Sequence, residues 1–187
     1  MKNLVMSMLA MVLLFFGCHR DEKDAGESTE KQYAEFKQKS QQPNDDEAAI
    51  DWNRVNAGRE DEDIAFFTQR YGWNVERRGN GLRIEILKEG RGELIKSEDE
   101  VTLEYVTCLL TGDTVYTSKQ LGPKSFRVDK SNEISGLHEP VKSLRKGSVA
   151  HIVIPSFLAY GVAGDGERIR GKASLAMTVE VTDVKPK

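Results

Sequence analysis

The sequence contains little cysteine and little histidine, with two and three of these residues among 187. Two cysteines cannot form the disulfide framework of a small secreted domain, and they cannot supply a cysteine-based zinc site. The chain has no excess of basic residues either, since its formal net charge is −3 at pH 7. It therefore lacks the electrostatic footprint of a nucleic-acid-binding protein. A Ser/His/Asp arrangement and a phosphate-binding loop are also absent from the sequence.

The longest apolar run covers residues 4–16, with Ser7 as its only polar member. It is too short for a membrane span of about 20 residues, so residues 1–17 are predicted to be a signal peptide. The end of this run, LFFGC, resembles a bacterial lipobox, although Phe15 stands where leucine is usual. Cys18 is therefore expected to carry a lipid anchor. An ordinary signal peptide with a chance cysteine is the alternative.

Residues 18–44 are predicted to be the lipidated cysteine and a flexible tether. The stretch HRDEKDAGESTEKQ after Cys18 has no large aliphatic side chain, so it cannot bury enough apolar surface to offset its ordering entropy. The run 18–22 resembles the export tag of some surface lipoproteins, and a plain charged linker is the alternative. The expected location is the cell envelope, lipid-anchored at the outer membrane, with the folded part facing the periplasm or the cell surface.

Residues 45–79 are predicted to form a helical preface of two helices that meet at Gly58. The second helix, 59–71, carries an apolar face with the i, i+2, i+3, i+7 spacing of an amphipathic helix. This face consists of Ile64, Phe66, Phe67 and Tyr71. Gly72 is expected to cap the helix, and Trp73 to pack on the globular domain. Dimerisation through the apolar face is the alternative to packing within the chain.

From Gly81 onward the apolar period changes to two, which is typical of half-buried strands. The alternating runs predict strands over 82–86, 101–110, 115–117, 125–128, 149–154 and 175–182. One helix opens after Ile134 and is expected to end near Lys146 and Gly147. Several antiparallel strands with one short helix inserted late predict an α+β fold. Cys108 falls inside a strand and is expected to be a small, half-buried apolar side chain.

Five short motifs in the second half of the chain occur in a characteristic order. They are Leu103-Glu104-Tyr105, Thr111-Gly112-Asp113, Ile134-Ser135-Gly136-Leu137, Ala159-Tyr160-Gly161 and Ala173-Ser174-Leu175. With these motifs, residues 80–187 resemble the FKBP-type peptidyl-prolyl cis–trans isomerases. The resemblance implies a curved antiparallel sheet of five or six strands wrapped on one short helix, preceded here by the small helical segment. The lipobox and the helical preface look most like the bacterial lipoprotein branch, which includes gliding-motility-associated isomerases.

The resemblance also implies an apolar pocket for a proline-containing segment. Its catalytic positions match Tyr105 and Tyr160, and the Tyr160 hydroxyl is expected to bond a substrate carbonyl. The Ile134 position is expected to hold the substrate through its backbone amide. The full set of matched substrate-binding positions is Tyr105, Val115, Tyr116, Phe126, Ile134, Leu137, Tyr160, Ile169 and Met177.

Several of these positions depart from the family pattern. Leu137 stands in place of the usual floor tryptophan, Val115 and Met177 in place of rings, and Tyr116 in place of an acid. The loop 164–171 is unusually charged for the family, which is expected to change the peptides that are accepted. Without the resemblance, the two catalytic tyrosines would be interpreted as core residues with satisfied hydroxyls.

The implied function is a peptidyl-prolyl cis–trans isomerase that assists the folding of exported or envelope proteins. The pocket would bury the proline ring, exclude water and bind the twisted X–Pro bond better than either planar form. No cofactor and no metal are implied. The expected partners are proline-containing polypeptide segments and a lipid bilayer through Cys18, and not nucleic acid. The alternative is a catalytically weak lipoprotein that uses the same pocket as a peptide-binding module or chaperone.

Overall fold

The structure is a computed structural model that describes residues 45–187 of the chain. The predicted signal peptide, the lipidation at Cys18 and the predicted tether lie outside these residues. The chain divides after Asp51 into two units, and the domain described below belongs to the second, Trp52–Lys187. In the described part of the chain, no helix combines the length and the apolar character needed to cross a membrane.

One continuous helix, α2 (Asp45–Tyr71), replaces the two helices that were expected to meet at Gly58. An interior glycine costs a helix only about 1 kcal/mol relative to alanine, so Gly58 weakens α2 locally without ending it. The real end lies at Gly72, as predicted, where φ is +66°. The amide of Trp73 there donates to the carbonyl of Thr68 at 2.9 Å, which completes a glycine-type C-cap.

The apolar face of α2 is narrower than the spacing predicts. Ile64 and Phe67 are buried, at 1% and 5% exposure, whereas Phe66 is 67% exposed and Tyr71 is about half exposed. Positions three apart lie on one side of a helix, but a position two residues on lies on nearly the opposite side. The prediction of one buried four-residue face was therefore wrong for Phe66, and Tyr71 only borders that face.

Besides the buried side chains of Ile64 and Phe67, a ring contact just after α2 and several polar contacts attach this helix to the rest of its unit. The Trp73 indole stacks on the His151 ring at 3.8 Å between centroids, which confirms that Trp73 packs on the globular domain. Arg83 donates to Asp61 at 2.8 Å. The Glu60 carboxylate accepts from the backbone amide of Ser156 at 2.6 Å and from the hydroxyl of Ser174.

Replacing Glu60 with alanine is expected to lower the free energy of unfolding by about 1–3 kcal/mol, because a part-buried amide and hydroxyl lose their acceptor. The matched control is Glu62→Ala, which makes the same change two residues further along α2 at an exposed position. Chemical denaturation of both variants measures the difference. Equal stability of the two variants would show that Glu60 contributes nothing to the attachment.

Seven strands form one antiparallel sheet. They are β1 (Glu76–Arg77), β2 (Arg83–Lys88), β3 (Glu100–Leu109), β4 (Thr114–Thr117), β5 (Lys124–Arg127), β6 (Val149–Ile154) and β7 (Leu175–Lys185). Their order is β1-β2-β6-β7-β3-β4, and β5 also pairs with β3. Six of the strands occupy the predicted runs, and the two-residue β1 is an addition to them. The predicted α+β fold is confirmed.

The other helical elements are short: α3 (Ser118–Leu121), α4 (Ser135–Val141) and the 3-10 helix η1 (Ser156–Leu158). The prediction that α4 extends to Lys146 and Gly147 was wrong. Leu137, Val141 and Leu144 have the i, i+4, i+7 spacing of a helix, and all three are fully buried. Leu144 reaches the core from a turn in which its amide donates to the Val141 carbonyl, so the helical period continues past the helix itself.

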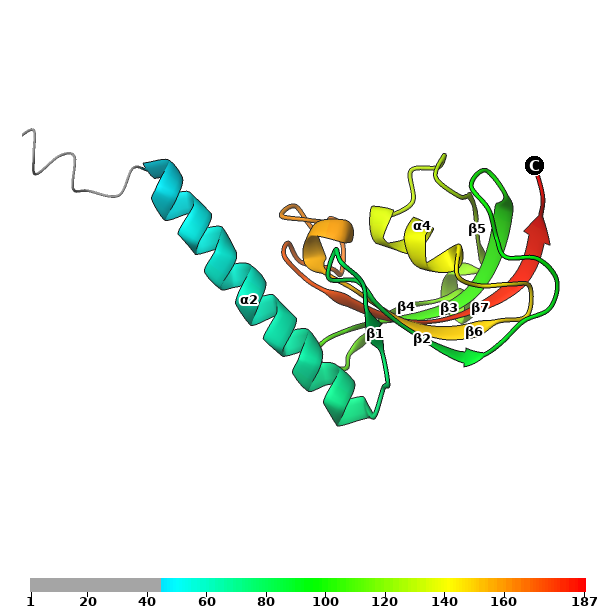
Figure 1. The fold of residues 1–187 in the computed structure, drawn as a ribbon, viewed down its shortest axis with the longest axis horizontal. Coiled ribbons are helices and arrows are strands. Elements are labelled where there is room, and N and C mark those ends of the chain that lie inside the picture. Colours follow the sequence, from blue (N-terminus) through cyan, green and yellow to red (C-terminus); the bar gives the residue numbers. More distant parts are fainter. Residues whose placement is uncertain (1–44) are drawn as a thin grey trace, which may run out of the picture. The chain divides into compact units, whose positions relative to one another are not determined.

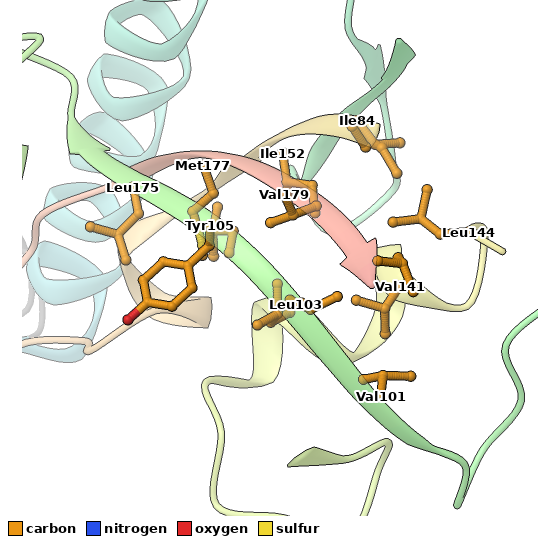
Figure 2. Close-up of a cluster of buried hydrophobic side chains, with 14 of the residues drawn as sticks. Ile84, Val101, Leu103, Tyr105, Val141, Leu144, Ile152, Leu175, Met177 and Val179 are labelled. Carbon is orange, nitrogen blue, oxygen red and sulfur yellow. The ribbon is translucent and has the colours of Figure 1, made fainter. Parts of the chain in front are cut away.

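The core lies between α4 and the face of the sheet that curves around it (Figure 1). Figure 2 shows aliphatic side chains from β3, β7 and α4 meeting there. All four residues predicted to point inward from the last strand are buried: Leu175, Met177, Val179 and Val181. Burial of each such side chain is worth about 1.5–3 kcal/mol, so this face determines how β7 is oriented.

Candidate functional site

A cavity of about 330 Å³ lies at one end of the core. Its apolar lining includes Tyr105 from β3, Leu175 and Met177 from β7, and Ile169 from the loop between β6 and β7. Figure 2 shows Tyr105, Leu175 and Met177 together at one end of the buried cluster, with the Tyr105 hydroxyl pointing away from the aliphatic side chains. A cavity of this size and lining suits a small apolar group.

Six of the nine predicted binding residues line this cavity, although they are spread over 73 positions of the chain (177 − 105 + 1). They are Tyr105, Tyr116, Ile134, Tyr160, Ile169 and Met177. β3 and β7 are neighbours in the sheet, with Tyr105 paired to Val179, and this pairing places Tyr105 and Met177 side by side. The fold thus brings most of the predicted site to one place.

The other three predicted binding residues do not line the cavity and belong to the core. Leu137, expected at the floor, is fully buried in α4. Phe126 lies on β5 two residues beyond Lys124, where its ring packs edge-on against His138 at 5.4 Å. Val115 alternates with Tyr116 on β4, so only Tyr116 reaches the cavity. Direct substrate contact by these three residues finds no support in this geometry.

Tyr160 lies on the cavity wall in the turn after η1. Two backbone hydrogen bonds fix this turn, from Ala159 to the Pro155 carbonyl and from Gly161 to the Ser156 carbonyl. Burial raises the pKa of Tyr160 above its ordinary value, and no side chain among the described residues hydrogen bonds to its hydroxyl. The hydroxyl is therefore a protonated donor that remains available to a ligand in the cavity.

Glu133 and Lys124 form an ion pair at the cavity wall, with 2.8 Å between Nζ and Oε2. The other carboxylate oxygen of Glu133 accepts from the backbone amide of Ile134 at 3.1 Å. The Lys124 ammonium also lies 5.5 Å from the centre of the Tyr105 ring, within cation–π range. The Ile134 amide, which was expected to hold the substrate, thus donates to Glu133.

Tyr116 and Asp165 join β4 to the charged loop across the cavity wall. The Tyr116 hydroxyl donates to Asp165 Oδ2 at 2.5 Å, with Glu167 Oε2 at 3.4 Å. Asp165 Oδ1 accepts from three successive backbone amides, at 2.9 Å from Glu167, 3.0 Å from Arg168 and 2.8 Å from Ile169. The strand position where an acid was missing in the sequence therefore faces a carboxylate that comes from the loop.

The contacts between Tyr116 and Asp165 shift the pKa values of both side chains. The hydrogen bond to Asp165, with burial adding to it, raises the pKa of Tyr116 to about 12. Burial alone would raise the pKa of Asp165, but the Tyr116 hydroxyl and the backbone amides outweigh it and lower that pKa below its ordinary value. Tyr116 is therefore neutral and Asp165 anionic at every pH near neutrality.

The two histidines among the described residues, His138 and His151, take part in structural contacts. His138 Nδ1 accepts from the backbone amide of Asp129 at 3.0 Å, and His151 Nδ1 lies 3.2 Å from Glu85 Oε2. Among residues 45–187, no group of three His, Cys, Asp or Glu side chains is arranged to hold a metal ion. Cys108 is half-buried, as expected, and its sulfur lies 3.4 Å from the Thr114 hydroxyl.

Seven cavity residues are absent from the predicted set of substrate-binding residues. They are Thr107, Leu121, Lys124, Glu133, Asp165, Glu167 and Leu175. Thr107 and Leu175 were detectable, because each belongs to the same face of its strand as a predicted residue two positions away. The unusual charge of the loop pointed to Asp165 and Glu167, but the sequence does not show which loop residues turn inward.

Comparison with known proteins gives one family and several relatives. Residues 92–182 match the family model of the FKBP-type peptidyl-prolyl cis–trans isomerases. The FKBP-type isomerase FkpA of Escherichia coli K12 is 37% identical over 115 residues, which cover 60% of this chain and 41% of FkpA. A probable FKBP-type isomerase of Haemophilus influenzae is 35% identical over 117 residues, covering 62% of this chain and 48% of the relative.

The fold is also similar to a solved structure. The crystal structure of FkpA from Escherichia coli matches with a TM-score of 0.60 and 28% identity, covering 88% of this chain and 73% of the other. The chain spans less than half the length of the two curated relatives described above. The sequence similarity therefore concerns only part of those two relatives, and the cavity lies inside the matched region with all of its lining residues between 105 and 177.

Proposed function

We propose that this chain, which belongs to the FKBP-type peptidyl-prolyl cis–trans isomerase family, catalyses the cis–trans isomerisation of X–Pro bonds in polypeptides. The observation that carries the proposal is the apolar cavity of about 330 Å³ with an unpartnered tyrosine hydroxyl on its wall. The apolar part accepts a proline ring, and the hydroxyl offers one donor to a neighbouring carbonyl.

The reaction needs no nucleophile, because only rotation about the amide bond is required. Uncatalysed X–Pro bonds interconvert over tens to hundreds of seconds, across a barrier of about 18–20 kcal/mol that reflects amide resonance. The twisted amide is less polar than the planar one, so a water-poor apolar cavity favours it. A cavity that fits the twisted bond better than either planar form lowers the barrier by differential binding.

Within this mechanism, Ile169, Leu175 and Met177 surround the proline ring, and Tyr105 forms the wall beside them. The Tyr160 hydroxyl donates to a substrate carbonyl and fixes the position of the bond that rotates. The Ile134 amide binds a second carbonyl once it is released from Glu133. A substrate that binds the Ile134 amide has to displace the hydrogen bond from this amide to Glu133. This requirement favours a second candidate function, a peptide-binding module with slow turnover.

The test is the isomerisation rate of short X–Pro peptides with the purified protein. Ile169→Glu is expected to reduce kcat/KM by more than roughly tenfold, since it places a charge in the apolar cavity. Val162→Glu is the matched control: it makes the same change in the same loop at a residue that is 81% exposed, and full activity is expected. A wild-type rate equal to the uncatalysed rate for every X would reject the enzyme, and peptide binding without turnover would support the module.

The N-terminal part of the proposal rests on the sequence. Residues 1–17 act as a signal peptide, Cys18 carries the lipid, residues 18–44 form a tether, 45–79 a helical preface and 80–187 the isomerase domain. The protein then belongs to the lipoprotein branch and serves proline-containing segments of exported or envelope proteins from the outer membrane. Radiolabelled fatty acid should be incorporated by the wild type and not by Cys18→Ser, and a membrane-impermeant label on intact cells distinguishes the surface from the periplasm.

A further inference from the structure

The charges around the cavity are unevenly neutralised. Four charged side chains line it: Lys124, Glu133, Asp165 and Glu167. Lys124 and Glu133 neutralise each other through their ion pair, and their side chains are only 26% and 15% exposed. The remaining two are both acidic and both lie on the loop between β6 and β7. The cavity therefore has an excess of negative charge on one side.

No cation among the described residues forms an ion pair with Asp165 or Glu167. The nearest candidate in sequence, Arg168, donates instead to the Val115 carbonyl at 2.9 Å, with its guanidinium 5.5 Å from the centre of the Tyr116 ring. Arg168 is thereby held on the Tyr116 side and does not line the cavity. A bound ligand with a positive group would therefore meet both carboxylates without competition from a cation of the described residues.

Asp165 is fixed in position, while Glu167 is exposed at the rim. The three backbone amides and the Tyr116 hydroxyl account for both oxygens of Asp165, which ties the loop to β4 and keeps the carboxylate charged. Glu167 is exposed, and among the described residues its side chain has only the long contact of 3.4 Å to the Tyr116 hydroxyl. Asp165 thus supplies a negative charge at a fixed position. Glu167 supplies a carboxylate that can contact a ligand directly.

We infer that Asp165 and Glu167 make this cavity select polypeptides with lysine or arginine next to the bound proline over those with glutamate or aspartate. The inference rests on the proposed function, since it concerns the substrate class of the same site. Charges near a protein surface interact modestly and are screened by salt, so we expect a preference of roughly three- to tenfold at low ionic strength.

The experiment uses two peptide series that differ only in the residue before, or only in the residue after, the proline: lysine, leucine or glutamate. Affinity is measured by fluorescence anisotropy of labelled peptides, and kcat/KM by the isomerisation assay. In at least one series the order is expected to be lysine, then leucine, then glutamate. The lysine-to-glutamate ratio should fall toward one in about 0.5 M salt, where the screening length drops to a few ångströms.

Variants locate the effect. Glu167→Gln is expected to reduce the lysine-to-glutamate ratio, and Asp165→Asn to reduce it as well. Glu180→Gln removes the same charge from an exposed site on β7 outside the cavity, and it should leave the ratio at the wild-type value. A ratio near one in both series, a preference for glutamate, or an equal change in all three variants would overturn the inference. A lysine preference in affinity with no turnover on any peptide would support it and reject the enzyme instead.

Discussion

Replacing Gly136 with valine is expected to lower the free energy of unfolding by about 3 kcal/mol, at the upper end of the usual cost of overpacking a core. Gly136 is the second residue of α4, at the point where this helix contacts β6 and the end of η1. A Cβ atom built there would overlap Ile154 Cγ2 and press on the Cβ and the carbonyl of Leu158. Ile154 is fully buried, so it has no free space into which to move.

Thermal unfolding followed by circular dichroism measures this effect, with an expected fall in Tm of roughly 6–12 °C for a chain of this size. The matched control is Gly58→Ala in α2, where nothing lies within 4 Å of an added Cβ. Helix propensity favours alanine there by up to about 1 kcal/mol, so the control should not lower the Tm. An unchanged Tm for Gly136→Val would mean that α4 and β6 are less closely packed than the structure shows.

The strands were predictable because the core imposes a period of two on them. On β7, alternate apolar residues all turned out to be buried, and the same rule located β3 and β6. The rule fails at edges: Ile86, which continues the alternation of β2, is 37% exposed, while Arg83 in the same strand is buried and paired with Asp61. Leu82 and Ile84 keep the expected orientation, and Arg83 is buried because it pairs with a residue 22 positions away, which no local pattern shows.

The helices were predicted less well, for two opposite physical reasons. Gly58 was interpreted as a break, but its small helical penalty is not enough to stop α2. The helix was expected to continue to Lys146 and Gly147, and the burial of Leu144 does follow the helical period, yet a turn carries this residue. In both places the sequence indicates which side chains are small or buried. The backbone conformation depends on hydrogen bonds that the local sequence does not predict.

The candidate site shows the same division. Tyr105, Ile134 and Tyr160 were found through the family resemblance, and the cavity contains all three. The pair Tyr116 and Asp165 was not found, because its members lie 49 positions apart and come from a strand and a loop of unrelated pattern. Only the tertiary structure shows that a carboxylate lies where the acid is missing from the strand. It is the carboxylate of Asp165, which the loop places next to the Tyr116 hydroxyl.

Replacing Tyr160 with phenylalanine is expected to reduce kcat/KM for an X–Pro peptide roughly three- to tenfold, the usual worth of one hydrogen bond. Tyr160→Ala should reduce it roughly a hundredfold, because the half-buried ring is lost as well. Tyr71→Phe is the matched control, since it removes the same hydroxyl from α2 outside the cavity, and wild-type activity is expected. Equal activity of Tyr160→Phe and the wild type would remove this hydroxyl from the mechanism.

The pH dependence gives a second measurement on the same group. The hydroxyl can donate only while it is protonated, and burial raises the pKa of Tyr160 above its ordinary value of 10.0. A raised tyrosine pKa extends the neutral form to higher pH, so the contribution of the donor is fully present at neutral pH and is lost only above about pH 10. The ratio of wild-type to Tyr160→Phe activity should therefore be constant from about pH 6 to about pH 9. A ratio that falls toward one within this range would show that Tyr160 ionises too early to act as the donor.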